Sequence, residues 1–427
     1  MVLIRRRNVR NMPHRLRAYG MYAKMRSELR RKLRLAELLA TLLKSNYVVR
    51  VKQRERALKL FLATMLSSIF NILFVDVPSP VRRKHNPRTI ESFSPFDCYR
   101  RFRIRKPDLK RVLRLLEIPI HVKLENGSVF TGEEIFLFGL NRFTTCAHID
   151  DLISTYGRES SQWVRAFKWF ILFMLNRWGY LLTRMLHFWV RYFEAFSEKI
   201  RRKLIKKGHN GGLPWLFRIC CFIDCTVISS CRPGSGPAGD GVDAPRYNNY
   251  IQMAFYNGWK HHHGTKWQSV ESPIGVCMDM FGPRSFKRCD LNLLNSSNIN
   301  NKMADVQLGK PEQNQKCLFG DGIYPTDTHL LSRAFGGADG MASIRIANEW
   351  DYGITANLFP FIKWRSAQKL LSSKDISYYY FVATILRNIN VILYGCVTSS
   401  YFETDDDYLE DMCDLKLDEY LSNIYRI

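Results

Sequence analysis

The sequence predicts a mixed α/β (α+β) fold in which a sheet flanked by helices follows a helical region. Two observations lead to this prediction. Short apolar runs rich in β-branched and aromatic residues, which are typical of strands, are concentrated in the second half of the chain. Helix start and stop signals dominate the stretch from residue 89 to about residue 205. With 427 residues, 46% of them hydrophobic, the chain is long enough for two or three domains with a sizeable core.

The first block, residues 1 to about 88, is a basic arm that we expect to be mostly helical. It ends at Pro78-Ser79-Pro80 and the cluster Arg82-Arg83-Lys84, a break typical of a linker. Residues 1–60 hold 18 Lys and Arg against 3 Glu, and so supply +15 of the net charge of +25. This charge predicts a polyanionic partner, most often nucleic acid. The alternative is an organellar transit peptide, which is also rich in arginine.

The second block, residues 89 to about 205, is predicted to be helical from its local signals. Pro107 stands near the start of a predicted helix at 106–116. Thr131 is expected to cap a helix at 132–143, with Glu134 at the capping-box position.

A possible helix-turn-helix follows in the same block. A short helix at 148–156 would be closed by Gly157, and a longer helix would begin at Glu159. The polar side chains of this longer helix would then face a DNA groove. They are Ser160, Ser161, Gln162, Arg165 and Lys168. The alternative is an ordinary helical bundle that packs on the core.

The third block, residues 206 to about 396, is predicted to contain both strands and helices. Strands are expected at 216–228, 250–256, 265–270 and 275–281, and just before Asp321, with a Gly/Pro-rich loop at 229–249. We expect the strand that ends at Asp321 to lie beside the strand that contains Asp224. A helix would then carry Glu349, and a final helix at 378–394 would cover the sheet.

Three acids of this block are candidate site residues. Asp224 interrupts an apolar strand, and an ionised carboxylate is costly to bury unless it is paired or holds a metal. Asp224, Asp321 and Glu349 have no obvious basic partner, and such a set suits Mg²⁺ or Mn²⁺ and metal-dependent phosphoryl transfer. The alternatives are a strand Asp satisfied by backbone amides or Arg, a turn Asp and a helix-surface Glu.

Several short stretches in this block follow one another in a characteristic order. They are Phe222-Ile223-Asp224-Cys225-Thr226, Cys231-Arg232-Pro233, Tyr256-Asn257-Gly258-Trp259-Lys260, His263-Gly264-Thr265-Lys266-Trp267-Gln268, Phe281-Gly282-Pro283, Gly320-Asp321-Gly322-Ile323-Tyr324-Pro325 and Ile344-Arg345-Ile346-Ala347-Asn348-Glu349. In this order they resemble the DDE endonuclease domain of Harbinger-type transposases and of nucleases derived from them. The chain departs from the family at Ile274 and over 335–341.

The resemblance implies a ribonuclease-H-like mixed sheet flanked by helices, and a DNA endonuclease or transposase. Asp224, Asp321 and Glu349 would be its catalytic and metal-binding residues, with two Mg²⁺ or Mn²⁺ ions. The implied reaction is phosphodiester cleavage at transposon ends, followed by attack of the freed 3′-OH on target DNA. Asp290 stands where many relatives carry an Asp, and we expect it, like Asp327, to be structural.

DNA is the partner that the resemblance implies. Lys260, Lys266 and Arg345 could neutralise its phosphates near the cleavage site. Relatives often work with a separate Myb-like DNA-binding protein, and a homo-oligomer is compatible with the family. The competing hypotheses are a domesticated, catalytically weak DNA-binding protein and an RNA- or chromatin-binding adaptor.

Other features of the chain favour a reducing compartment, and with DNA as the partner they favour the nucleus. Eleven cysteines occur without a CxxC pair. We expect no membrane span, because the apolar stretch 60–75 is too short. His261-His262-His263 is expected to be a solvated or phosphate-facing loop rather than a zinc site, and the acidic tail, residues 397–427, a solvated end.

Overall fold

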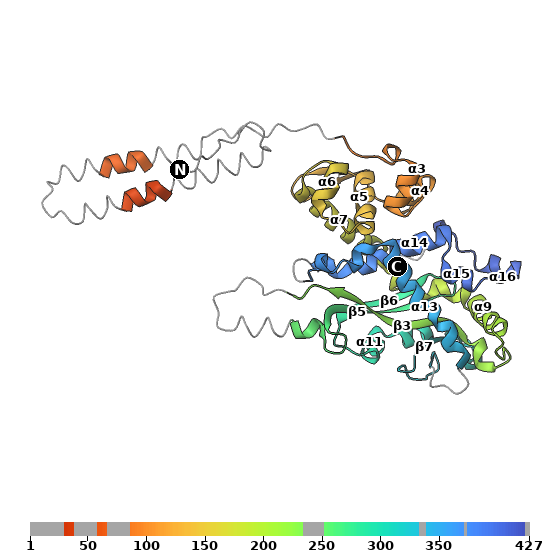
Figure 1. Ribbon diagram of the computed structural model, residues 1–427. Coiled ribbons are helices and arrows are strands. Elements are labelled where there is room, and N and C mark those ends of the chain that lie inside the picture. Colours follow the sequence, from red (N-terminus) through yellow and green to blue (C-terminus); the bar gives the residue numbers. More distant parts are fainter. Residues whose placement is uncertain are drawn as a thin grey trace, which may run out of the picture. The chain divides into compact units, whose positions relative to one another are not determined.

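Figure 1 shows the structure, a computed structural model of the chain. It describes residues 30–37, 58–65, 86–233, 252–332, 339–370 and 374–422. The chain divides into two compact units, Met1–Lys84 and His85–Ile427. In the first unit the described residues form two helical stretches, 30–37 and 58–65, as predicted for the basic arm. The other residues of that arm up to 85 lie outside the described residues.

The region before the sheet is helical, as predicted. Its helices are α3 (Pro95–Phe102), α4 (Lys106–Leu115), α5 (Gly132–Thr144), α6 (Ile149–Tyr156), α7 (Ser160–Trp178), α8 (Leu186–Trp189) and α9 (Phe193–Lys206), and a ribbon of β1 (His121–Lys123) and β2 (Val129–Thr131) precedes α5. The helices predicted at 106–116, 132–143 and 148–156 are thus confirmed as α4, α5 and α6.

Local contacts explain where these helices begin and end. The Thr131 hydroxyl accepts a hydrogen bond of 3.2 Å from the backbone N–H of Glu134, which caps α5. The Glu134 carboxylate accepts two further bonds from Arg158, at 3.0 and 3.1 Å. Pro107 lies in the first turn of α4. Gly157 closes α6 with a φ of +63°, a conformation that glycine adopts without strain.

A mixed sheet follows, with the strand order β6–β5–β3–β7–β8. Its strands are β3 (Ile219–Ser230), β5 (His262–Glu271), β6 (Cys277–Ser285), β7 (Cys317–Gly320) and β8 (Leu330–Ser332), and the short β4 (Tyr256–Asn257) pairs with the first residues of β5. β5 runs antiparallel to both β3 and β6, whereas β7 runs parallel to β3 and β8 parallel to β7. The predicted mixed α/β fold is therefore confirmed.

The strands expected around Asp224, at 265–270, at 275–281 and before Asp321 are all present. The strand expected at 250–256 is wrong, because residues 252–255 are helical and β4 begins only at Tyr256. Residues 252–254 are Gln, Met and Ala, which are good helix formers. Of the expected loop at 229–249, β3 takes the first two residues, and residues 234–251 lie outside the described part of the chain.

Helices pack on both faces of the sheet (Figure 1). On one face, apolar side chains of α9 and of α13 (Asp339–Leu358) form a cluster with Phe222 of β3 and Phe319 of β7. On the same face, Trp267 of β5, which pairs with Thr226 of β3, contacts Tyr380 and Phe381 of α14 (Tyr379–Tyr394). On the opposite face, Gln268 of β5 donates to the Ser297 hydroxyl of α11 (Asp290–Ser297) at 2.8 Å. The final helix predicted at 378–394 is therefore confirmed, and it covers the sheet as expected.

The remaining helices are α12 (Ile299–Asp305), α15 (Val397–Tyr401), α16 (Asp407–Met412) and α17 (Leu417–Tyr420).

The acidic tail is not a solvated end over its described part, 397–422. In the tail, Leu409, Leu417 and Tyr420 are buried. Four of its acids pair with basic residues of the helical region: Asp406 with Arg202, Glu410 with Lys199, Asp418 with Arg111 and Glu419 with Arg191. The prediction was wrong because these partners are far away in the sequence.

Two further observations concern the chain's chemistry. All eleven cysteines are free thiols. Among the described residues, one helical stretch, Ile376–Tyr394, is long and apolar enough to cross a membrane, and 78% of its apolar window is buried inside the protein. Such burial is the arrangement of a core helix.

Candidate active site

Asp224 and Asp321 hold equivalent positions on neighbouring parallel strands. β3 pairs with β7 so that Phe222 lies opposite Phe319. Asp224 is two residues past Phe222, and Asp321 is two residues past Phe319. Asp321 lies just beyond the end of β7. Because side chains alternate between the faces of a sheet, Asp224 lies on the face that α13 covers, and the negative charge of Asp321 raises the pKa of Asp224. Neighbouring strands are about 4.8 Å apart, so the two carboxyl groups belong to one site.

Asp321 also opens a turn. Its Oδ1 accepts a hydrogen bond of 3.0 Å from the backbone N–H of Ile323, and the backbone N–H of Tyr324 donates to the Asp321 carbonyl at 3.2 Å. This geometry is the local one that Asp favours in turns. The turn directs the chain from β7 towards β8 and leaves the side chain half-buried at the strand end.

Arg345 lies between the Asp224 and Glu349 carboxylates. Its Nη1 donates to Asp224 Oδ2 at 2.7 Å, and its Nη2 reaches Glu349 Oε1 at 3.4 Å. Met341, Ile344 and Ala347 fix α13 against β3 and β7, which places the neighbouring Arg345 over the sheet. Since one planar guanidinium contacts both acids, their nearest oxygens lie within roughly 8 Å of each other.

The expectation that the three acids have no basic partner is therefore wrong. Arg345 was expected to neutralise DNA phosphates, and it pairs with two of the acids instead. The Asp224 Oδ1 also accepts a bond of 2.7 Å from the backbone N–H of Cys225. Asp224 is thus satisfied by a backbone amide and an arginine. Glu349 keeps 57% of its side chain exposed, one turn after Arg345 on the same helix.

Asp224 sits in surroundings that favour its protonated form. Burial raises the pKa of Asp224 to about 6, and the positive charge of Arg345 and the Cys225 amide oppose this rise. The negative charges of Asp321 and Asp290 raise the pKa further. An acid whose ionised form is disfavoured by burial and by like charges is typical of a functional site.

Asp290 and Lys266 form a second pair beside Asp224. The Lys266 ammonium contacts the Asp290 carboxylate and donates to the carbonyl oxygen of Arg288 at 3.1 Å. Both side chains are largely buried, so Lys266 is not presented to a phosphate as expected. Asp327 has a structural environment, because the Asn300 amide donates to its Oδ2 at 3.2 Å and its backbone forms a bridge with Leu330.

The donor set fits a divalent cation in part. Mg²⁺ and Mn²⁺ take carboxylate oxygens, and Asp224 together with Asp321 fits such an ion. Glu349 does not complete the set, because Arg345 lies between it and Asp224. Across the described ranges, no group of three or more His, Cys, Asp or Glu could hold a metal ion. An ion held by all three acids therefore requires Arg345 to turn away.

The remaining predicted DNA contacts lie on other elements. On α7, Ser161, Arg165 and Lys168 are exposed and Ser160 is half-buried. Gln162 donates to the Ser128 hydroxyl at 3.4 Å. α6, the turn at Gly157 and α7 thus have the expected order and lengths, and the exposed polar residues stay available for a partner. Lys260 is exposed in the turn between β4 and β5.

One buried ionic cluster was not predicted from the sequence. Arg387 of α14 donates to Glu271 of β5 at 2.9 Å and lies 3.7 Å from Asp351 of α13, and all three side chains are almost fully buried. Burial, together with the charge of Glu271, raises the pKa of Asp351. The sequence did carry one signal for this cluster: an Arg in the middle of the apolar run 379–394, where a buried charge requires a partner. The cluster connects β5 of the sheet to α13 and α14, which pack on the same face.

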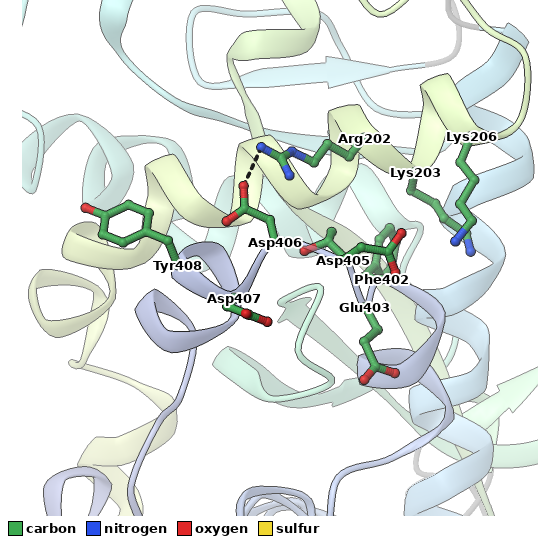
Figure 2. A pocket seen from close by; sticks show the side chains of 10 residues that line it. Arg202, Lys203, Lys206, Phe402, Glu403, Asp405, Asp406, Asp407 and Tyr408 are labelled. Atoms are coloured by element: carbon green, nitrogen blue, oxygen red, sulfur yellow. Dashed lines mark ion pairs between the residues drawn. The ribbon is translucent and has the colours of Figure 1, made fainter.

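A pocket of about 600 Å³ lies between α9 and the segment 402–408. Figure 2 shows Arg202, Lys203 and Lys206 on the α9 side and acids of the segment opposite, with Arg202 paired to Asp406 at 2.8 Å. Burial and the charges of Lys206 and Lys207 lower the pKa of Lys203. None of the three candidate acids lines this pocket, whose charged side chains are three basic ones and four acidic ones.

Comparison with known proteins identified no relative of this chain. The chain matches no family model, no curated protein and no solved structure.

Proposed function

We propose that this protein is a metal-dependent DNA endonuclease of the DDE type, with Asp224, Asp321 and Glu349 as its catalytic acids. The observation that carries the proposal is that Asp224 of β3 and Asp321, just beyond the end of the parallel strand β7, each lie two residues past the paired Phe222 and Phe319. Two carboxylates on adjacent strands, beneath a helix that carries a third, form a cation-binding arrangement.

The sheet supports the proposal at a second level. β3, β5 and β6 form an antiparallel meander, and β7 then returns to lie parallel to β3. This order is the one expected for a ribonuclease-H-like domain whose first strand carries the first acid. The stretches that resemble Harbinger-type transposases provide β3, β5, the end of β7 and α13.

Within this proposal each residue has a distinct role. Asp224 and Asp321 would hold a divalent cation, Mg²⁺ or Mn²⁺, and Glu349 would complete the set once Arg345 leaves it. The bound metal supplies an activated water and stabilises the leaving oxygen of the phosphodiester. Arg345, once released from the acids, is positioned to meet a DNA phosphate. Charge attraction by the basic arm brings the DNA to the protein.

The wider biology follows the same proposal. A DNA nuclease with free thiols acts in the nucleus, and a transposase would join the freed 3′-OH to target DNA, as a homo-oligomer or with a separate DNA-binding partner protein. A domesticated, catalytically weak DNA-binding protein is the second candidate. The ion pairs of Arg345 with Asp224 and Glu349 favour this candidate, because an internal cation satisfies acids that otherwise need a metal.

Cleavage by the purified full-length protein tests the proposal. Supercoiled plasmid is incubated with wild type, Asp224→Asn and Asp305→Asn in Mg²⁺, Mn²⁺ or EDTA. Asp305 is an exposed acid at the end of α12 and serves as the matched control. We expect wild type and Asp305→Asn to nick DNA only with metal, and Asp224→Asn to be inactive while it still binds DNA. Absence of metal-dependent nicking by wild type would favour the second candidate.

A further inference from the structure

An exposed tryptophan stands in the turn between β4 and β5. Trp259 keeps 89% of its surface exposed, more than any other large hydrophobic residue among those described. A large aromatic ring left in water marks an interaction surface more often than a small apolar side chain does. Trp163, Trp178, Trp189 and Trp267 are, by contrast, fully buried.

The turn that carries Trp259 has a defined backbone. Asn257 Oδ1 accepts hydrogen bonds from the backbone N–H groups of both Trp259 and Lys260, each at 3.0 Å. The Asn257 amide donates to the carbonyl oxygen of Phe286 at 3.3 Å, and the His262 ring lies 5.1 Å from the Phe286 ring. These contacts hold the turn against the end of β6. The indole is therefore presented from a fixed base, which lowers the entropic cost of binding.

The surface around Trp259 is positively charged. Lys260 in the turn and Arg284, Lys287 and Arg288 at the end of β6 are all exposed. The acids of the sequence from 252 to 288 are Glu271 and Asp279. Both are buried, and they pair with Arg387 and Lys302. No acid of this stretch thus offsets the four exposed cations.

We infer that this surface, residues 258–261 together with 284–288, binds an unpaired nucleotide strand, with Trp259 stacked on a base. A positively charged groove or surface combined with an exposed aromatic ring is how proteins hold single strands without reading their sequence. The cations would contact phosphates on either side of the stacked base. The inference rests on the nucleic-acid partner of the proposed function, but not on cleavage.

The position of the surface suggests which nucleotide it holds. Asp224 pairs with Ser269 of β5, and His262 begins the same strand next to the turn. From Ser269 to His262 the strand advances about 23 Å, at roughly 3.3 Å per residue. Stacked bases rise about 3.4 Å each, so the turn lies about seven nucleotides from the acids. A strand that runs from the acids along β5 would meet Trp259 there.

Binding measurements without metal test the inference. Full-length wild type, Trp259→Ala and Trp259→Phe are titrated in EDTA with a fluorescent single-stranded 20-mer and with the matching blunt duplex. Loss of a base stack is expected to weaken single-strand binding between about 5-fold and about 150-fold in Trp259→Ala. Trp259→Phe should retain most of the affinity, because its ring still stacks. Duplex affinity should change little in both variants.

A control variant and a fluorescence measurement distinguish base stacking by Trp259 from a general effect of losing an exposed apolar side chain. Leu308→Ala removes another apolar side chain that is 80% exposed, and it should leave single-strand binding unchanged. Binding of the single strand should quench the tryptophan fluorescence of wild type more than that of Trp259→Phe. Equal single-strand affinity of Trp259→Ala and wild type overturns the inference, and so does an equal loss on the duplex. Cleavage plays no part, so an inactive nuclease that binds through Trp259 contradicts only the proposed function.

Discussion

The Arg345 guanidinium donates a hydrogen bond of 2.7 Å to the Asp224 carboxylate, across 121 residues of sequence. The same guanidinium reaches Glu349, one turn further along α13. This arginine satisfies an acid whose ionised form is disfavoured by burial. With a metal bound to Asp224, two cations would compete for one carboxylate. We therefore expect Arg345 to compete with a metal ion for this site.

The first prediction concerns this competition. Arg345→Gln removes the charge that competes with the metal while keeping a polar side chain. We expect the variant to bind Mn²⁺ about tenfold more tightly than wild type, a change of about 1.4 kcal/mol. Isothermal titration calorimetry with Mn²⁺ measures it, with Arg284→Gln as a control for general charge removal. Weaker Mn²⁺ binding in Arg345→Gln would show that Arg345 supports the site instead of competing for it.

The second prediction concerns pH. Because the pKa of Asp224 is raised to about 6 in the fold, the folded state binds its proton more tightly than the unfolded state does. The resulting stabilisation is complete below the unfolded pKa, near 4, and is lost as the pH rises through 6. Asp224→Asn lacks the titrating carboxyl group. Between pH 4 and pH 7, the free energy of unfolding of wild type should therefore fall by roughly 3 kcal/mol relative to that of the variant.

Urea unfolding in EDTA at several pH values measures this difference. Asp305→Asn is the control, because that acid is exposed. A difference between wild type and Asp224→Asn that stays constant over this range would mean that Asp224 is not held in costly surroundings.

The third prediction concerns the buried cluster of Arg387, Glu271 and Asp351. Arg387→Met leaves two buried carboxylates without their cation, and we expect it to lower the free energy of unfolding at pH 7 by about 3–5 kcal/mol. Adding Glu271→Gln to Arg387→Met removes one buried charge, and it should recover part of the stability. Chemical denaturation of the three proteins tests this, and full additivity of the two changes would contradict it.

The fourth prediction concerns the basic arm. Deleting residues 1–84 removes the first compact unit and leaves His85–Ile427 intact. Each phosphate that the protein neutralises contributes about −0.9 to the slope of log affinity against log salt. We expect the deletion to weaken duplex binding strongly at low salt and to flatten this slope. An unchanged slope would assign the charge of the arm to targeting or to protein docking.

Local signals let the sequence determine most of the individual elements. Pro107, Thr131 and Gly157 mark helix ends through contacts with residues a few positions away, so α4, α5 and α6 were predictable. A run of β-branched and aromatic residues marked β3 in the same way. The residues 252–255 were not predictable, because a short apolar run suits a strand and a helix alike.

The tertiary structure alone decided how the acids are satisfied. Charged side chains find their partners through space, and no local pattern shows that Arg345 faces Asp224 or that Arg387 joins Glu271. The tail illustrates the same rule, since its acids and its buried Tyr420 find partners on helices that precede the sheet and on α14. The register of β3 on β7, which brings Asp224 beside Asp321, likewise comes from the packing of the whole sheet, because side-chain alternation permits several alignments and the shared core selects one.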